Sequence, residues 1–312
     1  MRAIFMGTPD FAVPTLEAML DAGHEVIGVY TQPDRAKGRG KNVVFTPVKE
    51  TAIKHNIPVY QPARVRNPEI IEEIRAMAPE VIVVVAFGQI LPKALLDIPK
   101  YGCINVHGSL LPKYRGSAPI QWAVINGEKV SGATTMYMDE GIDTGDMLLK
   151  EEVVLDAKET SGSLLDKLSV VGAKLLVKTL GQIEDGTAVR KKQDDSLTGA
   201  YAKMLDKYMG NIDFSKPAEE IECLIRGLNP WPSAYTHFGK KTVKIWDADV
   251  SSEEYEGEYG EITEVTKDAF TVKTGKGSLV IRELQMEGKK RMKTDAFLRG
   301  AVLKKGDKFS QE

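Results

Sequence analysis

The segment Val81-Ile82-Val83-Val84-Val85-Ala86 decides the fold class, because it is apolar at every position. A strand with one face in solvent alternates polar and apolar residues, whereas a strand that is apolar throughout is covered on both faces. This segment therefore predicts the central strand of a parallel sheet that carries helices on both sides.

Strand and helix patterns alternate on either side of this central segment. Other short apolar or β-branched runs, which predict strands, lie at Arg2 to Met6, Glu25 to Tyr30, Cys103 to Val106 and Ala133 to Met138. Helical periodicity is found from Phe11 to Ala22, Thr46 to His55 and Pro68 to Met77, and a longer apolar stripe runs from Leu164 to Ile183. This alternation predicts a doubly wound, Rossmann-like α/β domain.

The pattern changes after Gly186. Arg190 to Asp195 is a charged run without periodicity, and a short amphipathic helix opens at Pro217 and ends at Asn229-Pro230-Trp231-Pro232. Short strands separated by glycines follow at Thr242 to Trp246, Ala269 to Lys273 and Ser278 to Leu284. We therefore predict an α/β domain over residues 1–189, a linker over 190–207 and a small, OB-like β-barrel domain over 208–312.

Length and composition bound the class of protein. The chain has 312 residues, of which 42% are hydrophobic and 28% charged, so it can form two globular domains and is neither disordered nor fibrous. Its two cysteines, Cys103 and Cys223, allow no disulfide framework and no zinc cluster. The apolar runs are too short to span a bilayer, and the first residues resemble a strand rather than a cleavable leader. We expect a cytoplasmic protein without a membrane segment or a metal.

The charge is unevenly distributed although the net charge is only -2. The stretch from Asp34 to Lys41 carries four basic residues and one acid, and Val265 to Ser310 holds twelve Lys or Arg against five acidic residues. An anionic partner could bind either basic region, and an ordinary solvated surface would have the same composition. Charge alone leaves these two interpretations open.

The polar residues that could carry chemistry follow a predicted strand, between Gly102 and Gly116. Asn105 and His107 are two residues apart, so their side chains point to the same side of the sheet, near the edge where open α/β folds bind ligands. A hydrogen-bonded core histidine would explain His107 equally well. A second polar segment, Met138 to Asp146, contains Asp143, and the spacing does not show whether Asp143 reaches His107.

A dinucleotide-binding site is disfavoured by the first strand-to-helix turn. A nicotinamide-dependent oxidoreductase needs a glycine triad there, and Met6-Gly7-Thr8-Pro9-Asp10 has none.

Several motifs together resemble the methionyl-tRNA formyltransferase family. They are Gly7 to Phe11, Thr31 to Arg35 with Gly38 to Lys41, Ile104 to Pro112, Ala118 to Gln121, Gly141 to Asp146, and Asn229 to Pro232. The Asn-x-His-x-Ser-Leu-Leu-Pro and Asp-Thr-Gly motifs alone mark the wider group of folate-dependent formyltransferases. The basic loop and the C-terminal domain narrow the resemblance to the enzymes that act on tRNA.

The resemblance implies a reaction and a role for each catalytic residue. Family members move the formyl group of 10-formyltetrahydrofolate to the amino group of methionine on initiator methionyl-tRNA. Asn105 would donate to the oxyanion, His107 would supply a proton or a hydrogen bond, and Asp143 would orient the imidazole and relay the proton of the amine. This chemistry needs no metal and no covalent nucleophile.

The resemblance also implies binding segments and an oligomeric state. Folate would lie against Phe87, Gly88, Gln89, Ile90 and Leu91 and against Ser109, Leu110, Leu111 and Pro112. Leu110 and Leu111 could be core residues instead, but their position between Gly108 and Pro112 favours a pocket wall. Initiator tRNA would be bound by Arg35, Lys37, Arg39 and Lys41, with help from the C-terminal domain. The family is typically monomeric, which is the state we expect here.

Two other function classes stay open at this point. A formyltransferase acting on an amino sugar or a nucleotide amine would share Asn105, His107 and Asp143 but would not need the basic loop. A protein that binds RNA or folate without catalysis would not need the three polar residues together.

Overall fold

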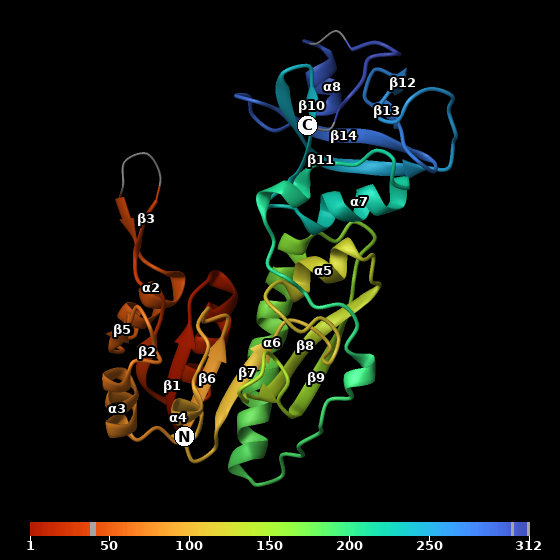
Figure 1. Cartoon of the computed structure of the whole chain (residues 1–312). Coiled ribbons are helices and arrows are strands. Elements are labelled where there is room, and N and C mark those ends of the chain that lie inside the picture. Colours follow the sequence, from red (N-terminus) through yellow and green to blue (C-terminus); the bar gives the residue numbers. More distant parts are fainter. Residues whose placement is uncertain (38–41, 301–302, 311–312) are drawn as a thin grey trace. The chain divides into compact units, whose positions relative to one another are not determined.

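The structure is a computed structural model of the chain that describes residues 1–37, 42–300 and 303–310 (Figure 1). The chain folds into two compact units, each built from several stretches of sequence. The N-terminal unit comprises Met1–Pro119, Val130–Val154 and Leu165–Ala202, and the C-terminal unit comprises Ile120–Lys129, Leu155–Leu164 and Lys203–Glu312. Each unit has its own core and is described by itself.

A seven-stranded sheet forms the centre of the N-terminal unit, in the order β5-β2-β1-β6-β7-β8-β9. The strands are β1 (Arg2–Gly7), β2 (Glu25–Tyr30), β5 (Val59–Tyr60), β6 (Val81–Val85), β7 (Cys103–His107), β8 (Val130–Tyr137) and β9 (Met147–Val154). The first five in this order pair in parallel, whereas β8 pairs antiparallel with β7 and β9 pairs antiparallel with β8. Every residue of β6 is buried, which confirms its predicted central position.

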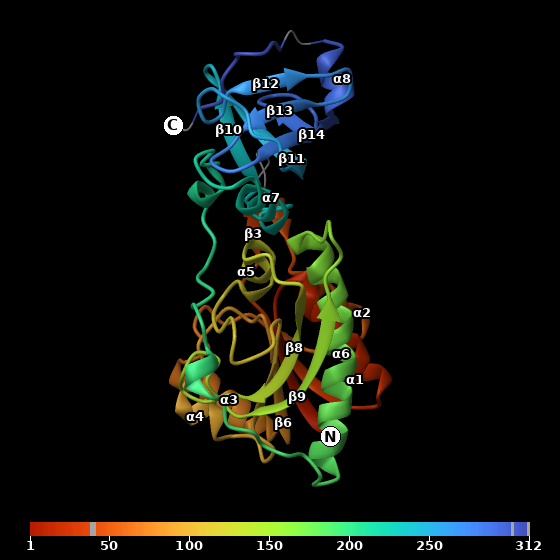
Figure 2. The same cartoon turned by 90° about the vertical axis from the view of Figure 1, so that its right-hand side faces the viewer.

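Helices cover both faces of this sheet, so the doubly wound, Rossmann-like prediction is confirmed. One face carries α1 (Val13–Asp21), preceded by the 3-10 turn η1 (Asp10–Ala12), α2 (Pro47–Lys54) and the long α6 (Ser161–Glu184); the other carries α3 (Pro68–Met77) and α4 (Lys93–Leu96) (Figure 2). Thr135 on β8 and Thr179 on α6 share a buried hydrogen bond of 2.7 Å, which fixes α6 on the sheet.

Helices α2 and α3 begin at residues that favour a helix N-terminus. The Thr46 side chain accepts a hydrogen bond of 3.2 Å from the Lys49 backbone N–H, and Pro47 occupies the first helical position of α2. Pro68 takes the same position in α3, which ends where Ala78 adopts a left-handed backbone.

The described part of the basic stretch contains a short strand. Arg35–Lys37 forms β3, which pairs with β4 (Asn42–Val44), so the predicted tRNA-binding residues Arg35 and Lys37 lie on a strand. The other two, Arg39 and Lys41, lie outside the described residues.

A small polar cluster supports the start of this strand. Lys49 Nζ lies 2.5 Å from Asp34 Oδ2 and 2.8 Å from Gln61 Oε1. The Gln61 amide donates in turn to Asp34 Oδ1 over 2.8 Å. The hydrogen bond from Lys49 lowers the pKa of Asp34, so the carboxylate stays ionised and the cluster stays paired at neutral pH.

An antiparallel sheet forms the core of the C-terminal unit, in the order β10-β11-β14-β13-β12, with β15 beside β14. The strands are β10 (Ala234–Phe238), β11 (Lys241–Ser251), β12 (Ile262–Val265), β13 (Phe270–Lys273), β14 (Ser278–Met286) and β15 (Met292–Lys293). Residues 307–310 join its two edges: Ser310 exchanges backbone hydrogen bonds with His237, and Ile262 N–H donates to the Asp307 carbonyl over 2.7 Å. This closure produces the predicted small barrel.

Helices α5 (Pro119–Ile125), α7 (Ala218–Gly227) and α8 (Thr294–Leu298) and the short 3-10 turn η3 (Lys207–Gly210) accompany the barrel. The apolar face of α7 packs into the barrel core through Ala218, Ile221 and Ile225. Because residues 217–228 carry their apolar side chains at helical spacing, the sequence predicted this helix correctly.

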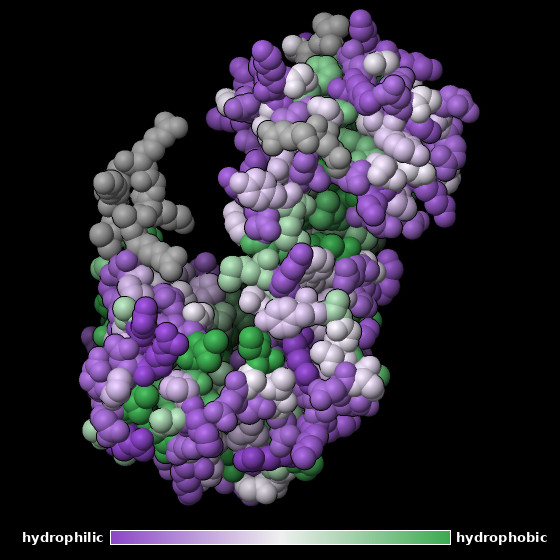
Figure 3. Space-filling view, viewed as in Figure 1, coloured by the Kyte–Doolittle hydropathy of each residue, from purple (hydrophilic) through white to green (hydrophobic). Residues whose placement is uncertain are grey.

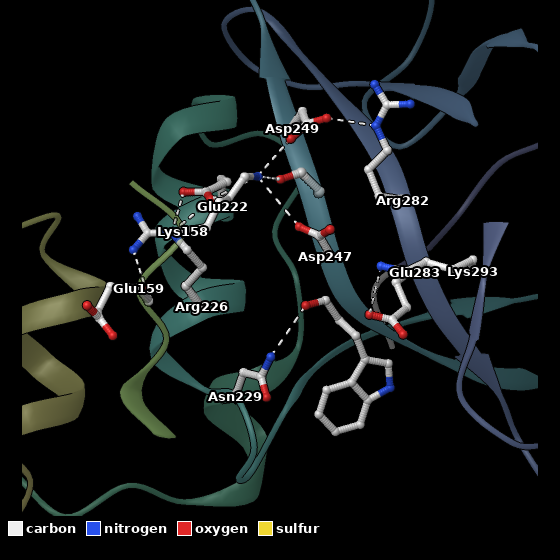
Figure 4. A network of polar contacts seen from close by, with 12 residues as sticks. Lys158, Glu159, Glu222, Arg226, Asn229, Asp247, Asp249, Arg282, Glu283 and Lys293 are labelled. Carbon is white, nitrogen blue, oxygen red and sulfur yellow. Dashed lines mark hydrogen bonds and ion pairs between the residues drawn. The ribbon is translucent and has the colours of Figure 1, made fainter. Parts of the chain in front are cut away.

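An ionic network ties the connection before α6 to the barrel (Figure 4). Lys158 Nζ lies 2.8 Å from Asp249, 3.5 Å from Asp247 and 3.6 Å from Glu222. Arg226, one turn later in α7, pairs with Glu222, with 2.8 Å between Nε and Oε1. These pairs explain why residues 155–164 belong to the C-terminal unit although they lie between β9 and α6 in the sequence.

The segment predicted as a linker makes regular backbone contacts with the N-terminal unit. Lys191 exchanges backbone hydrogen bonds of 2.8 and 2.9 Å with Met147, and Ala202 N–H donates to the Arg115 carbonyl over 2.8 Å. The 3-10 turn η2 (Asp195–Leu197) lies between these anchors. The functional division at residues 189 and 207 stays a prediction.

Hydrophilic residues cover most of the face of each unit that is shown in Figure 3. Hydrophobic residues reach this face only in small patches, the usual surface of a folded domain. Among the residues that the structure describes, no helix combines the length and hydrophobicity needed to cross a bilayer.

Candidate active site

The candidate site begins at the carboxyl end of β7, where Asn105 and His107 lie on one face of the strand. Asn105 pairs with Val84 of β6, and His107 pairs with Thr134 of β8. Cys103, on the same face, packs into the core beneath α3 and α4, so the two polar side chains lie farther along the strand, toward its end. The predicted shared face is therefore present.

His107 is buried, and its imidazole is held by a hydrogen bond at Nε2. Nε2 lies 2.9 Å from the backbone carbonyl of Tyr114. A carbonyl only accepts, so Nε2 carries a proton and Nδ1 faces the Asp143 carboxylate, with 3.7 Å between Nδ1 and Oδ2. The structure thus brings together two residues that the sequence could not place beside each other.

Asp143 is also held by a backbone group. The Gly116 backbone N–H donates to the same Oδ2 atom over 2.9 Å, and the Asp143 backbone has a left-handed φ of 56°. Aspartate tolerates this conformation better than most residues, and the position costs strain that the neighbouring contacts must offset. With 7% of the His107 side chain and 14% of the Asp143 side chain exposed, their interaction is only weakly screened by water.

The Asn105 carboxamide differs from these two groups because no described residue holds it. It is half-buried, and within residues 1–37, 42–300 and 303–310 it has no hydrogen-bond partner. A half-buried amide without a partner is available to donate to a ligand oxygen. Asn105, His107 and Asp143 could therefore serve as an oxyanion donor, a proton donor and an acidic partner.

The first predicted folate segment, Phe87 to Leu91, divides between core and surface. Phe87 and Leu91 are buried in the core formed with α3 and α4. The Gln89 side chain is occupied, because it accepts from Val65 N–H at 2.7 Å and donates to the Pro62 carbonyl at 3.1 Å. Gly88 and Ile90 are exposed, Ile90 to 74%.

The second predicted folate segment, Ser109 to Pro112, is a tightly held loop. Thr134 Oγ1 donates to the Ser109 carbonyl over 2.7 Å and accepts from the Leu111 N–H over 3.1 Å. Leu111 is fully buried in a cluster with Met136 and Met147, and Pro112 is also buried. Leu110 is half-buried, so it keeps some surface for a ligand. The folate-binding role of both segments stays a prediction.

Comparisons with known proteins match nearly the whole chain. A sequence profile described as formyl transferase matches residues 1–180, and a formyl transferase C-terminal domain profile matches 204–302. The methionyl-tRNA formyltransferase of Lachnospira eligens is 57% identical over 311 residues, 98% of each chain. That of Clostridioides difficile is 53% identical over 306 residues, 98% of this chain and 99% of the other.

The chain belongs to the methionyl-tRNA formyltransferase family. It is therefore an enzyme, a formyl-group transferase, as the sequence motifs predicted. The family assignment rests on identity over both units, so it covers the barrel as well as the α/β unit.

Solved structures share the fold of this formyltransferase at low identity. A sugar 3N-formyl transferase named WlaRD, crystallised with dTDP and 5-N-formyl-tetrahydrofolate, aligns with a TM-score of 0.67 at 19% identity, over 93% of this chain and 99% of that one. HypX of Aquifex aeolicus in complex with tetrahydrofolic acid aligns with a TM-score of 0.61 at 15% identity, over 100% of this chain and 51% of HypX. These two likenesses concern the fold.

The cysteine nearest the site of the formyltransferase is not suited to act as a nucleophile. Burial raises the pKa of the Cys103 thiol to about 12, so it stays protonated at neutral pH. In the described part of the chain, no group of three or more His, Cys, Asp or Glu side chains is arranged to hold a metal ion.

Sequence reasoning missed several residues around the formyltransferase site. The Tyr114 carbonyl and the Gly116 N–H are backbone groups, which side-chain patterns do not reveal. Gln193 donates to the backbone carbonyl of Asp143 from within the charged run predicted as a linker. No local sequence signal marks it, because its partner is 50 residues away.

Proposed function

We propose that this enzyme transfers the formyl group of 10-formyltetrahydrofolate to the amino group of methionine on initiator methionyl-tRNA. The observation that carries the proposal is the pair formed by His107 Nδ1 and Asp143 Oδ2, 3.7 Å apart, at the end of the strand that also presents Asn105. The full-length relatives named for this reaction support the choice of substrate.

The reaction is the attack of an amine on a formamide-like carbonyl. The methionine nitrogen forms a bond to the formyl carbon, the carbonyl oxygen becomes an oxyanion, and the carbon–N10 bond of the folate then breaks. The attacking nitrogen loses one proton and the folate nitrogen gains one, so the proton count balances. The enzyme must stabilise the oxyanion and move this proton.

Each of the three polar side chains has a proposed role in this sequence. The unpartnered amide of Asn105 donates to the oxyanion. His107 supplies the proton or hydrogen bond to the oxyanion or to the leaving nitrogen. Asp143 orients the imidazole, stabilises its charged form and accepts the proton of the amine, directly or through a water.

The substrates are proposed to bind at the predicted segments. Folate lies against residues 87–91 and 109–112, where Gly88, Ile90 and Leu110 keep exposed or half-exposed surface. The tRNA is bound by Arg35, Lys37, Arg39 and Lys41 and by the C-terminal barrel over residues 208–312. The stretch from Asp34 to Lys41 carries four basic residues and one acid, which supports this role because RNA binding depends on positive charge against the phosphates.

The cellular setting follows from the substrate. A protein that formylates initiator tRNA for translation acts in the cytoplasm, and we propose that it does so as a monomer. Size-exclusion chromatography with light scattering checks the oligomeric state, with a single species near 34.3 kDa expected.

Formyl transfer to three acceptors tests the proposed function. Labelled 10-formyltetrahydrofolate is offered with methionyl initiator tRNA, methionyl elongator tRNA or free methionine, at equal methionine concentrations. The proposal predicts efficient transfer to the initiator, weaker transfer to the elongator and little to free methionine. An enzyme that formylates a nucleotide-linked amino sugar faster than the initiator tRNA would contradict it.

A further inference from the structure

Gln193 contacts the backbone of the turn that carries the candidate catalytic carboxylate. Its amide nitrogen donates to the backbone carbonyl of Asp143 over 2.7 Å and to that of Gly145 over 2.9 Å. One side chain therefore fixes two carbonyls of the turn that carries the carboxylate. Both donor hydrogens of the amide are used, so a glutamine is fully satisfied here.

Gln193 is itself held by a buried arginine. Arg115 Nε donates to Gln193 Oε1 over 2.9 Å, and Arg115 Nη2 lies 2.8 Å from Asp195 Oδ1. Arg115 is only 9% exposed, so its guanidinium is largely shielded from water, although the Asp195 carboxylate at its other end is exposed. The orientation of the Gln193 amide is thereby fixed, because the arginine can meet only its oxygen.

The three residues 114–116 connect this arrangement to both catalytic side chains. The Tyr114 carbonyl accepts from His107, the Gly116 N–H donates to the Asp143 carboxylate, and the Arg115 side chain between them holds Gln193. Asp143 is thus held both at its carboxylate oxygen, by Gly116, and at its backbone carbonyl, by Gln193. Its left-handed backbone, with φ of 56°, needs such support.

We propose that Gln193 is a positioning residue, which acts on formyl transfer by holding Asp143 in place against His107. This inference rests on the proposed function, because it assumes that Asp143 takes part in the reaction. A different role would be purely structural: Gln193 would anchor residues 190–202 to Arg115 without affecting the carboxylate.

Two substitutions separate these roles. Gln193→Leu has a similar volume and removes all three hydrogen bonds. Gln193→Glu keeps an acceptor for Arg115, with added charge, but sets a carboxylate oxygen against the carbonyls of Asp143 and Gly145. A pure anchor would tolerate the glutamate, whereas a positioning residue would not, because the turn that carries Asp143 would be pushed away.

The experiment measures kcat and KM for both substrates in Gln193→Leu, Gln193→Glu, Asp143→Asn and the double variant Gln193→Leu/Asp143→Asn. Asp194→Ala is the matched control: it removes the side-chain cap of η2 beside Gln193 and leaves the Gln193 contacts intact. Circular dichroism and the affinity for a folate analogue check that each variant is folded.

The proposal predicts that kcat falls about 10- to 100-fold in both Gln193 variants, as for a misplaced catalytic group, while both KM values stay within about twofold. Asp194→Ala keeps the kcat of the unmodified enzyme. In the Asp143→Asn background, Gln193→Leu lowers kcat by less than about twofold, because the carboxylate that Gln193 positions is already absent.

Three outcomes would overturn the positioning role: an unchanged kcat in Gln193→Leu, activity in Gln193→Glu close to that of the unmodified enzyme, or losses that multiply in the double variant. A Gln193→Leu chain that fails to fold also overturns it if Gln193→Glu folds and stays active. An Asp143→Asn variant with full activity would contradict the proposed function instead, because it would show that Asp143 takes no part in the reaction.

Discussion

His107 Nε2 lies 2.9 Å from the backbone carbonyl of Tyr114, seven residues later in the chain. This contact decides which ring nitrogen faces Asp143, because Nε2 must donate to the carbonyl and Nδ1 alone points toward the carboxylate. In the proposed mechanism, Nδ1 is therefore the ring nitrogen that faces Asp143, and both side chains have little access to bulk water.

Asn105→Asp should reduce kcat about 100- to 1000-fold, which is typical for loss of one oxyanion donor. The substitution keeps the shape of the side chain, but it replaces the amide donor with an acceptor whose charge repels the oxyanion. Steady-state formyl transfer measures the effect. Asn56→Asp, at an exposed turn, is the control and should keep full activity. An active Asn105→Asp enzyme would mean that another group stabilises the oxyanion.

The two cysteines should be alkylated at different rates, and both rates should rise with pH. Burial raises the pKa of Cys103 to about 12 and also raises the pKa of the half-buried Cys223. Because the thiolate reacts, alkylation of the folded enzyme should be slow at pH 7, quicker as the pH rises, and faster at Cys223 than at Cys103. Mass spectrometry of labelled peptides gives the order. Cys103→Ala should keep its activity, and a folded but inactive Cys103→Ala enzyme would give the thiol a role that we do not assign.

Lys158→Met should destabilise the C-terminal unit by about 1 kcal/mol at pH 7, the upper range for a half-exposed charge in a network. The hydrogen bond from Lys158 lowers the pKa of Asp249, so the ionised pair stabilises the fold above the ordinary carboxyl range. This stabilisation is lost as the pH falls through the lowered pKa. The penalty of Lys158→Met should therefore shrink in acid.

Tryptophan fluorescence during urea unfolding measures this penalty, because all three tryptophans lie in the C-terminal unit. Lys174→Met, at an exposed position of α6, is the control and should change the stability little at either pH. A Lys158→Met penalty that is equal at pH 7 and in acid would mean that lost packing, rather than charge pairing, is responsible.

Arg39→Ala should lower kcat/KM on initiator tRNA about tenfold and narrow the advantage over elongator tRNA. The prediction comes from the sequence: an arginine between two glycines can reach splayed bases and phosphates at a weakly paired RNA end. Transfer is measured on both tRNAs at several salt concentrations. Arg75→Ala on α3 is the control. If Arg39→Ala changes kcat/KM on neither tRNA, the basic C-terminal region is the better candidate for tRNA recognition.

Much of the N-terminal fold was predictable because burial leaves a local pattern. The apolar run over Val81–Val85 is a central strand, and the three- and four-residue steps after Leu164 form α6. The sequence did not reveal β9, whose residues are mostly half-buried or exposed and so show no clear apolar alternation. It also did not reveal the pairing of Lys191 with Met147, because backbone hydrogen bonds do not depend on side-chain identity.

The site was predictable in part for a related reason. The period of two along β7 placed Asn105 and His107 on one face. The approach of Asp143 depends on a turn with a left-handed backbone and on contacts with Gly116 and Gln193 that cross long stretches of sequence. Such tertiary contacts leave no periodic signal in a single sequence.

The most direct test of the central claim is single-turnover formyl transfer from 10-formyltetrahydrofolate to methionyl initiator tRNA by His107→Gln. A glutamine amide can still donate to the Tyr114 carbonyl, but it offers no nitrogen at the Nδ1 position beside Asp143. We expect a transfer rate lower by about 10²–10⁴, with the fold and the tRNA affinity unchanged. A folded His107→Gln enzyme that transfers the formyl group within about twofold of the normal rate would show that His107 has no catalytic role.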